Sequence, residues 1–426
     1  MEENRLFDGW ERALLLSLQL PEHTAEEIRQ SLTELQLLVE SLECEVADQI
    51  IQSRPQIHPA LFFGKGKMGL IKEAMRRLQA DAVIVDRTLS PKQVQNLERE
   101  LKCPVLDRTQ VILEIFARNA KSRAAKLQIR LAQSEYLFPR LVGLWKHLDR
   151  ERGGIGVSRG TGEKQIEKDR QYLRRRIMNL RDDLKRLERE RETQKKRRSH
   201  CLSVSLVGYT NAGKSTIMNA LTDSQLIAED RLFATLDSTT RLLEEGSRPK
   251  ILLSDTVGFI RNLPTELVAA FRSTLETVRD ADLLLHVVDA SGDFEAHIQT
   301  TLEVLEELDA HCIPLMQVFN KVDQLAPVEL ALLRHRFPNA VFVSALNGGV
   351  EELQDRIRKF FEQRMETITV QLDYRQSQQL SEIYEWSRVD EIDYEEEGIR
   401  LRLTTLPGYL NRLRNRLAPH FREIPA

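Results

Sequence analysis

A glycine-rich loop between an apolar segment and a helix start is the feature that most restricts the fold of this 426-residue chain. Residues 203–207 read SVSLV, residues 208–215 read GYTNAGKS, and TIMNAL follows. This is G-x-x-x-x-G-K-S in a strand–loop–helix setting, where backbone N–H groups turn towards phosphates at a helix N-terminus. The loop therefore predicts an α/β nucleotide-binding domain. Lys214 is expected to reach the β and γ phosphates, and the Ser215 hydroxyl to ligate Mg²⁺.

Three more motifs follow in order, each after a predicted strand. In LLSDTVG, Asp255 can hold the Mg²⁺ shell and the N–H of Gly258 can approach the γ-phosphate. In QVFNKVD, Asp323 can accept hydrogen bonds from two donors of guanine that adenine does not offer together, Asn320 can contact the far edge of the base, and Lys321 can lie over the ring. The backbone N–H groups of VFVSAL, residues 341–346, can meet guanine O6. Open α/β sheets bind ligands at the carboxyl ends of their strands, so the set predicts a GTP site.

The loop between the first two motifs, FATLDSTTR at 233–241, is rich in hydroxyl groups. We predict that Thr235 supplies a second Mg²⁺ ligand when the γ-phosphate is present, and that losing this contact on hydrolysis releases the loop. The alternative is that these are loop polar residues with no metal role. Phe259 stands where many GTPases have a glutamine that holds the attacking water. We expect its side chain to turn away from the phosphate, and turnover to be slow in the absence of a partner.

The predicted catalytic residues are Lys214, Thr235, Gly258 and Asn211. Several GTPases with asparagine at the position of Asn211 use K⁺ beside the phosphates, which offsets charge in the transition state. The alternative is that Asn211 shapes the loop, and comparing rates in K⁺ and Na⁺ distinguishes the two. The predicted nucleotide-contacting residues are Gly208, Tyr209, Thr210, Asn211, Ala212, Gly213, Lys214, Ser215, Thr216, Phe233, Ala234, Thr235, Leu236, Asp237, Asp255, Thr256, Val257, Gly258, Asn320, Lys321, Val322, Asp323, Ser344, Ala345 and Leu346.

Residues 121–200 hold 24 Lys and Arg against 11 Asp and Glu, although the whole chain has a net charge of -3. Apolar residues recur there at spacings of three and four, which predicts two helices packed as a hairpin. We expect this hairpin to contact a polyanion such as ribosomal RNA. The alternative is a solvated, charged helix face joined by a flexible turn. The predicted RNA-binding residues are those of a glycine-rich tip, Arg152, Gly153, Gly154, Gly156, Arg159, Gly160 and Lys164.

Strands alternating with helices predict a multidomain α/β fold in four parts. We expect a small N-terminal α/β domain at 1–110, a long basic helical hairpin at 111–200 with its tip at 151–164, a Ras-like P-loop GTPase domain at 201–365, and a small α+β domain at 366–426. The segment FFGKGK at 62–67 could cradle a phosphate of RNA or of a second nucleotide, or could simply begin a helix.

No apolar run approaches the roughly 18 residues that a bilayer requires, and the N-terminus does not read as a signal peptide. The four cysteines are far apart, which favours a reducing cytosol over a disulfide framework. We therefore expect a cytoplasmic monomer. Association with a membrane surface through the hairpin is the weaker alternative, because its arms lack an amphipathic insertion face.

The segments GYTNAGKST, FATLDSTTR, DTVGFI, NKVD and RGGIGVSRGTGEKQIE resemble the HflX family of ribosome-associated GTPases over nearly the whole chain. Ser238 departs from the proline expected in that family's switch loop. The resemblance implies binding to the large ribosomal subunit and its rRNA, with subunit dissociation or rescue of stalled ribosomes under stress. The alternative is a GTP-regulated ribosome assembly or RNA-binding switch in which hydrolysis only resets affinity. GTP and GDP are the expected ligands, Mg²⁺ the expected cofactor and K⁺ a second candidate, while binding of ATP stays open.

Overall fold

A computed structural model describes residues 10–151, 159–197, 201–222, 233, 239–244, 247–261, 272–374, 380–396, 398–417 and 421–424. The chain divides into two compact units. Unit 1 comprises Met1–Glu188, Arg231–Asp237 and Ile260–Ser273. Unit 2 comprises Arg189–Asp230, Ser238–Phe259 and Thr274–Ala426. The finer division into four domains remains a prediction.

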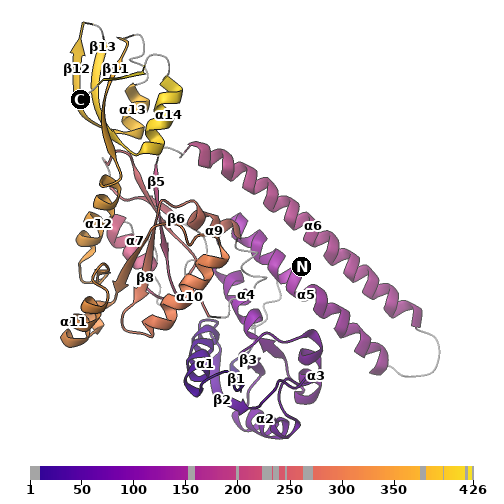
Figure 1. Cartoon of the computed structure of the whole chain (residues 1–426). Helices are drawn as coiled ribbons and strands as arrows, with labels where there is room; N and C mark the ends of the chain where they lie inside the picture. Colours follow the sequence, from indigo (N-terminus) through magenta and orange to yellow (C-terminus); the bar gives the residue numbers. More distant parts are fainter. Residues whose placement is uncertain are drawn as a thin grey trace. The chain divides into compact units, whose positions relative to one another are not determined.

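A four-stranded parallel sheet begins unit 1, with strand order β2-β1-β3-β4 (Figure 1). The expected small parallel α/β domain is therefore confirmed. Its central strands are buried on both faces, as parallel sheets covered by helices require. The elements are β1 (Arg12–Gln19), α1 (Ala25–Glu40), β2 (Glu45–Ser53), α2 (Lys65–Leu78), β3 (Ala82–Val85), α3 (Pro91–Leu101), β4 (Val105–Asp107) and α4 (Arg108–Asn119).

Capping boxes fix where three of these helices begin. The side chains of Thr24, Ser90 and Asp107 accept hydrogen bonds from backbone N–H groups in the first turns of α1, α3 and α4. Each pairing satisfies donors that a helix start leaves without partners. Thr24, followed by Glu26 and Glu27, is predicted as an N-cap from the sequence, and the structure confirms it. Helix α2 begins differently, because Gly64 caps it without a side chain while its own N–H donates to Gln52. This geometry favours the helix-start interpretation of residues 62–67.

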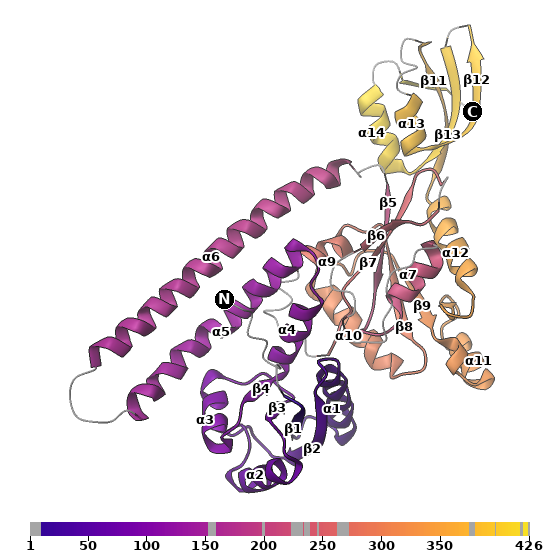
Figure 2. The same ribbon diagram turned by 180° about the vertical axis from the view of Figure 1, so that it is seen from behind.

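The basic segment forms two long helices, α5 (Arg123–Glu151) and α6 (Arg159–Arg197), which lie side by side in both views (Figures 1 and 2). Arg181 pairs with Glu135 at 2.6 Å, and the guanidinium of Arg174 lies 5.6 Å from the ring centroid of Phe138. Because 181 pairs with 135 and 174 with 138, the helices run antiparallel. The predicted hairpin is therefore present, and its residues up to Glu188 belong to unit 1.

Two details of the hairpin differ from the sequence-based expectation. The predicted hairpin region begins at 111, whereas helix α4 extends to Asn119 and the first arm, α5, begins only at Arg123. Arg159, Gly160 and Lys164 belong to α6 rather than to a loop at the tip. Isolated glycines cost a helix only about 1 kcal/mol each, which strong helix formers nearby can offset. The predicted tip residues Arg152, Gly153, Gly154 and Gly156 lie outside the described residues.

A six-stranded sheet in the order β10-β9-β8-β5-β7-β6 forms the core of unit 2, and only β6 runs antiparallel to its neighbour (Figure 2). Strand β5 is central and nearly fully buried. The elements are β5 (Leu202–Val207), α7 (Lys214–Thr222), β6 (Thr239–Leu242), β7 (Ile251–Asp255), α9 (Arg272–Arg279), β8 (Leu283–Asp289), α10 (Phe294–Glu307), β9 (Leu315–Asn320), the 3-10 turn η1 (Val322–Gln324), α11 (Pro327–Arg336), β10 (Val341–Phe342) and α12 (Val350–Glu362).

An antiparallel sheet in the order β12-β13-β11-β14 ends the chain. The sequence predicts an acidic turn at 393–398, but its first three residues belong to strand β12 and the turn itself is shorter. Strand β12 pairs with β13 and places Glu391 opposite Arg402. Cross-strand charge pairs of this kind favour the sheet despite the low strand propensity of acidic residues. The elements are β11 (Glu366–Leu372), α13 (Leu380–Trp386), β12 (Arg388–Glu395), β13 (Gly398–Thr405), α14 (Pro407–Leu417) and β14 (Phe421–Ile424). No helix in the described ranges has the length and apolarity needed to cross a membrane.

Candidate nucleotide-binding site

The loop between β5 and α7 can be built only with glycine at two positions. Gly208 has φ +146°, and a Cβ there would lie 2.1 Å from the carbonyl oxygen of Val287. Gly213 has φ +86°, and a Cβ there would lie 2.2 Å from Nδ2 of Asn320. Side chains at either position would clash and would strain the backbone. The loop is therefore held tightly between neighbouring strands, with its path set before any phosphate binds.

Lys214 is buried at the start of α7 and is turned onto the loop. Its Nζ donates to the carbonyl oxygens of Gly208 at 3.0 Å and Tyr209 at 2.8 Å. Burial lowers the pKa of Lys214 to about 8, although the nearby carboxylate of Asp255 acts in the opposite direction. A desolvated ammonium held by neutral carbonyls gains strongly from anionic oxygens, so this position is suited to phosphates.

Two oxygen groups that suit Mg²⁺ meet beside this lysine. The hydroxyl of Ser215 donates to Oδ2 of Asp255 at 2.6 Å, although the residues come from α7 and β7. Asp255 is buried, and a hydroxyl with a carboxylate is a hard donor set of the kind that Mg²⁺ prefers. These residues therefore fit the ion that the sequence predicts. No group of three or more His, Cys, Asp or Glu side chains is arranged as a metal site within the described part of the chain.

The segment after β7 is bonded directly to the phosphate-binding loop. The N–H of Phe259 donates to the oxygen of Gly208 at 3.1 Å, and the N–H of Thr210 donates to the oxygen of Phe259 at 2.8 Å. The Phe259 side chain is buried at 2% exposure. A Cβ at Gly258 would lie 2.8 Å from Thr210, so only glycine permits this approach. Phe259 therefore anchors the segment through its backbone and its ring.

The predicted guanine-binding residues make different contacts within the protein. The side chain of Asn320 donates to the oxygen of Ala212 at 2.9 Å and accepts from the N–H of Ala345 at 3.1 Å. It thereby joins three loops that surround the base site, a positioning role that the sequence did not indicate. Lys321 pairs with Asp289 at 2.7 Å, while Asp323 is exposed. Asp323 therefore has its carboxylate accessible to a base.

The last loop of the site, residues 344–348, is closed by its own hydrogen bonds. The N–H of Ser344 donates to the oxygen of Gly348 at 3.0 Å, and the N–H of Asn347 donates to Oγ of Ser344 at 3.3 Å. Ser344 is buried, whereas Leu346 is 83% exposed. The loop thus holds the backbone of Ala345 near Asn320, as expected for a loop whose N–H groups face the base.

Phe233 is the one described residue within the predicted segment 233–237. Its ring packs against Phe116 with centroids 4.6 Å apart, and its oxygen accepts from Asn119 at 2.9 Å. These contacts lie within unit 1, as do those of Arg261, whose side chain donates to Gln30 at 2.9 Å. The other predicted residues of this segment, which include the metal ligand, lie outside the described residues and stay predictions: Ala234, Thr235, Leu236 and Asp237.

Asn211 is exposed and has φ +59°. Asparagine tolerates this left-handed conformation better than most residues, which agrees with a role in shaping the loop. The role of K⁺ beside this residue stays a prediction.

Two histidines near the loop were not found from the sequence. The ring of His297 on α10 stacks on Tyr209 with centroids 4.0 Å apart. His286 on β8 is 1% exposed, and within the described part of the chain neither ring nitrogen has a hydrogen-bond partner. Burial, with a smaller contribution from Lys214, lowers the pKa of His286 to about 4. For His286, the sequence signal was a polar residue inside the apolar run LLLHVVD at 283–289.

Replacing His286 with leucine should reduce the acid sensitivity of unit 2. The pKa of His286 falls from the ordinary histidine value of 6.5 to about 4 in the folded protein, so the unfolded chain binds more protons between those values. The free energy of unfolding of the parent protein therefore decreases as pH falls from about 6.5 towards 4. At pH 5 this decrease should be about 2 kcal/mol, and His286→Leu should lack it. Urea midpoints at pH 7 and pH 5 measure it. Exposed His311→Leu is the control, and an unchanged pH dependence in His286→Leu would contradict the expectation.

A glycine-lysine-serine loop, an aspartate after the neighbouring strand and an N-K-x-D segment meet at one edge of a parallel sheet. Together they define a P-loop GTPase. Residues 203–321 match the family model described as "50S ribosome-binding GTPase". Residues 29–117 match "GTP-binding GTPase N-terminal", and residues 119–198 match "GTP-binding GTPase Middle Region".

The chain belongs to the HflX family of GTPases. It is 41% identical over 398 residues to GTPase HflX of Escherichia coli (strain K12), covering 92% of each chain. It is 40% identical over 409 residues to GTPase HflX of Caldanaerobacter subterraneus subsp. tengcongensis, covering 95% of this chain and 93% of the relative. The solved "crystal structure of SsGBP and GDP complex" is similar with a TM-score of 0.48 and 25% identity, covering 82% of this chain and 98% of that one. As a member of the HflX family with a matching GTPase domain, the protein is an enzyme that hydrolyses GTP.

Proposed function

We propose that this GTPase binds the large ribosomal subunit and its rRNA, and that it couples GTP binding and hydrolysis to ribosome subunit dissociation or rescue under stress. The long hairpin of α5 and α6 carries this proposal, because the segment 121–200 has 24 cationic against 11 anionic residues. A charge excess of this size on paired helices suits the phosphates of RNA. The description of the family model that matches residues 203–321 supports the same partner.

Hydrolysis is an in-line attack of water on the γ-phosphate. Lys214 and the backbone N–H groups of the loop stabilise the negative charge that develops on the phosphates. Ser215 and Asp255 would hold Mg²⁺, with Thr235 as the predicted further ligand, and the ion would supply additional neutralisation of charge. Phe259 is held by the loop and has no group that could orient water. The orientation of water is therefore expected to be completed on the ribosome, so intrinsic turnover is slow.

The rate of turnover with and without large ribosomal subunits tests this function. Purified large subunits should raise kcat for GTP by orders of magnitude if hydrolysis is coupled to a ribosomal step. If subunits bind but leave kcat unchanged, the alternative holds, in which the protein is an RNA-binding assembly switch and hydrolysis only resets affinity. Absence of binding in the GTP-analogue state would exclude both. A monomeric state, a cytoplasmic location and binding of ATP stay predictions.

Replacing Arg152 and Arg159 with alanine should weaken binding to large subunits while GTP affinity is unchanged. Both arginines flank the glycine-rich segment that joins the two helices of the hairpin, and both lie outside the nucleotide motifs in sequence. Guanidinium groups bind phosphates and stack on exposed bases, so their loss removes RNA contacts without touching the loop at 208–215. Pelleting with subunits, in parallel with GTP titration, measures both quantities. Equal pelleting of variant and parent would refute this role.

A further inference from the structure

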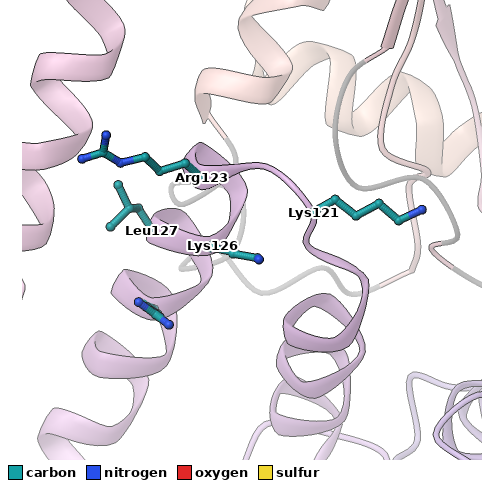
Figure 3. Close-up of a pocket in the computed structure, with 5 residues that line it drawn as sticks. Lys121, Arg123, Lys126 and Leu127 are labelled. Atoms are coloured by element: carbon teal, nitrogen blue, oxygen red, sulfur yellow. The ribbon is translucent and has the colours of Figure 1, made fainter. Parts of the chain in front are cut away.

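A cluster of cations surrounds the turn between α4 and α5, outside the nucleotide site. Lys121, Arg123, Lys126 and Arg130 line a cavity of about 350 Å³ together with Leu127, and all four cations are exposed. We call these four residues the elbow cluster. Figure 3 shows Lys121 on the turn and Arg123 and Lys126 at the start of α5. All of them belong to unit 1, so their arrangement is internal to one compact body.

The position of these cations is unfavourable for the helix that carries them. Ser122 caps α5 by accepting a hydrogen bond from the N–H of Ala125 at 3.1 Å. Arg123, Lys126 and Arg130 follow at spacings of three and four residues in the first two turns of α5, and its first turn has no acidic residue. A helix N-terminus is partly positive, and like charges three or four residues apart repel. An anion at this place would relieve both repulsions.

Two other arginines of unit 1, Arg108 and Arg140, are paired with carboxylates, whereas two members of the elbow cluster are not. Arg108 lies 2.8 Å from Asp86, and Arg140 lies 3.2 Å from Asp107. In contrast, the side chains of Arg123 and Lys126 make no hydrogen bond or ion pair with any part of the chain that the structure describes. Two exposed cations are therefore available to a ligand from outside the chain.

The directions of the side chains indicate an extended anion rather than a compact one. In the view of Figure 3, Lys121 and Lys126 point to one side of α5, whereas Arg123 points to the other. A single phosphate group could not contact cations that diverge in this way. Successive phosphates of a nucleic-acid backbone can, because they present negative charges at regular intervals along a strand.

We propose that the elbow cluster binds phosphates of an RNA backbone. This inference rests on the proposed function, since it names a second RNA contact of the same ribosome-binding chain. Helix α5 has 29 residues, and at 1.5 Å per residue its two ends are about 43 Å apart. The chain would then hold RNA at both ends of this arm, at the glycine-rich segment and at the elbow cluster. Two separated contacts fix the direction of the hairpin on RNA, which one contact leaves free to rotate.

The test measures how binding to purified large ribosomal subunits depends on KCl concentration, with the full chain bound to a non-hydrolysable GTP analogue. Each phosphate contact contributes about 0.9 to the slope of log Kobs against log[salt] for a duplex. Replacing both Arg123 and Lys126 with glutamine should therefore reduce the slope by roughly 2. A second double variant, Arg123→Lys with Lys126→Arg, keeps both positive charges and should have the slope of the parent protein. Arg76→Gln with Lys92→Gln, an exposed arginine and lysine elsewhere in unit 1, is the matched control and should leave the slope unchanged.

The outcomes separate this inference from the proposed function. If the parent protein does not bind large subunits, the proposed function fails. If the parent binds and the Arg123 and Lys126 variant has the same slope, the inference alone fails. Protein-free rRNA should reproduce the difference, and a difference seen only with intact subunits would identify an acidic protein partner instead. Thermal stabilisation by inorganic tripolyphosphate that is lost in the variant, with an unchanged RNA slope, would identify a site for small anions and would also overturn the inference.

Discussion

Replacing Lys214 with methionine should lower kcat/KM for GTP by about 10²–10³-fold, the usual effect of removing one group that stabilises transition-state charge. Methionine keeps most of the length of the side chain but has no charge. In the structure the ammonium is already desolvated and held by the oxygens of Gly208 and Tyr209, so it needs little rearrangement to face phosphates. Rates of phosphate release at low and saturating GTP measure the effect.

The same variant has a second readout that a merely damaged fold would not show. The pKa of Lys214 is lowered from 10.5 to about 8 in the folded protein, so the unfolded chain binds more protons between those values. The nucleotide-free parent should therefore gain stability as pH rises from about 8 to 10.5, and Lys214→Met should lack this gain. Exposed Lys359→Met on α12 is the control for both measurements. An unchanged kcat/KM in Lys214→Met would exclude the assigned role.

Replacing Asp323 with asparagine should lower the affinity for GTP by about 10²-fold, because two hydrogen bonds to a charged group are lost or weakened. The carboxylate is exposed beside η1 and accepts from the N1–H and 2-amino groups of guanine in the predicted complex. Xanthine keeps N1–H but carries an oxygen at position 2. A carboxamide offers one acceptor and one donor, so the variant should bind XTP more tightly than the parent does.

Calorimetric titration with GTP and XTP measures this change of preference. Asp309→Asn is a suitable control, because Asp309 is exposed and its left-handed backbone, with φ +55°, suits asparagine equally well. The control should bind GTP like the parent. Unchanged GTP affinity in Asp323→Asn would show that another group selects the base.

The nucleotide motifs could be recognised from the sequence because each is short, contiguous and attached to a predicted strand. The strands are short apolar runs, such as AVIV at 82–85, and their alternation with helices was sufficient to indicate a parallel fold. The start of α1 was also predictable, since Thr24 and Glu27 form a capping box within four residues. Local chemistry of this kind does not depend on distant parts of the chain.

The errors arose where distant residues decide the local structure. Asp393 and Glu395 were expected to belong to a turn, but pairing with β13, which includes the ion pair of Glu395 with Arg400, makes them part of strand β12. The glycines near Arg159 were expected to keep the tip irregular, but α6 continues through them. In both places a neighbouring strand or a long continuous helix overrides weak local preference.

The sequence by itself determined the class of the enzyme, the order of its nucleotide motifs and the charge of its hairpin, because composition and contiguous motifs carry that information. Only the tertiary structure decided what each side chain does. Asn320 joins its own segment to two other loops, Lys321 pairs with Asp289, and Phe259 is bonded to the phosphate-binding loop. Each of these contacts joins residues from different strands, and their distances follow from the sheet order rather than from spacing along the chain.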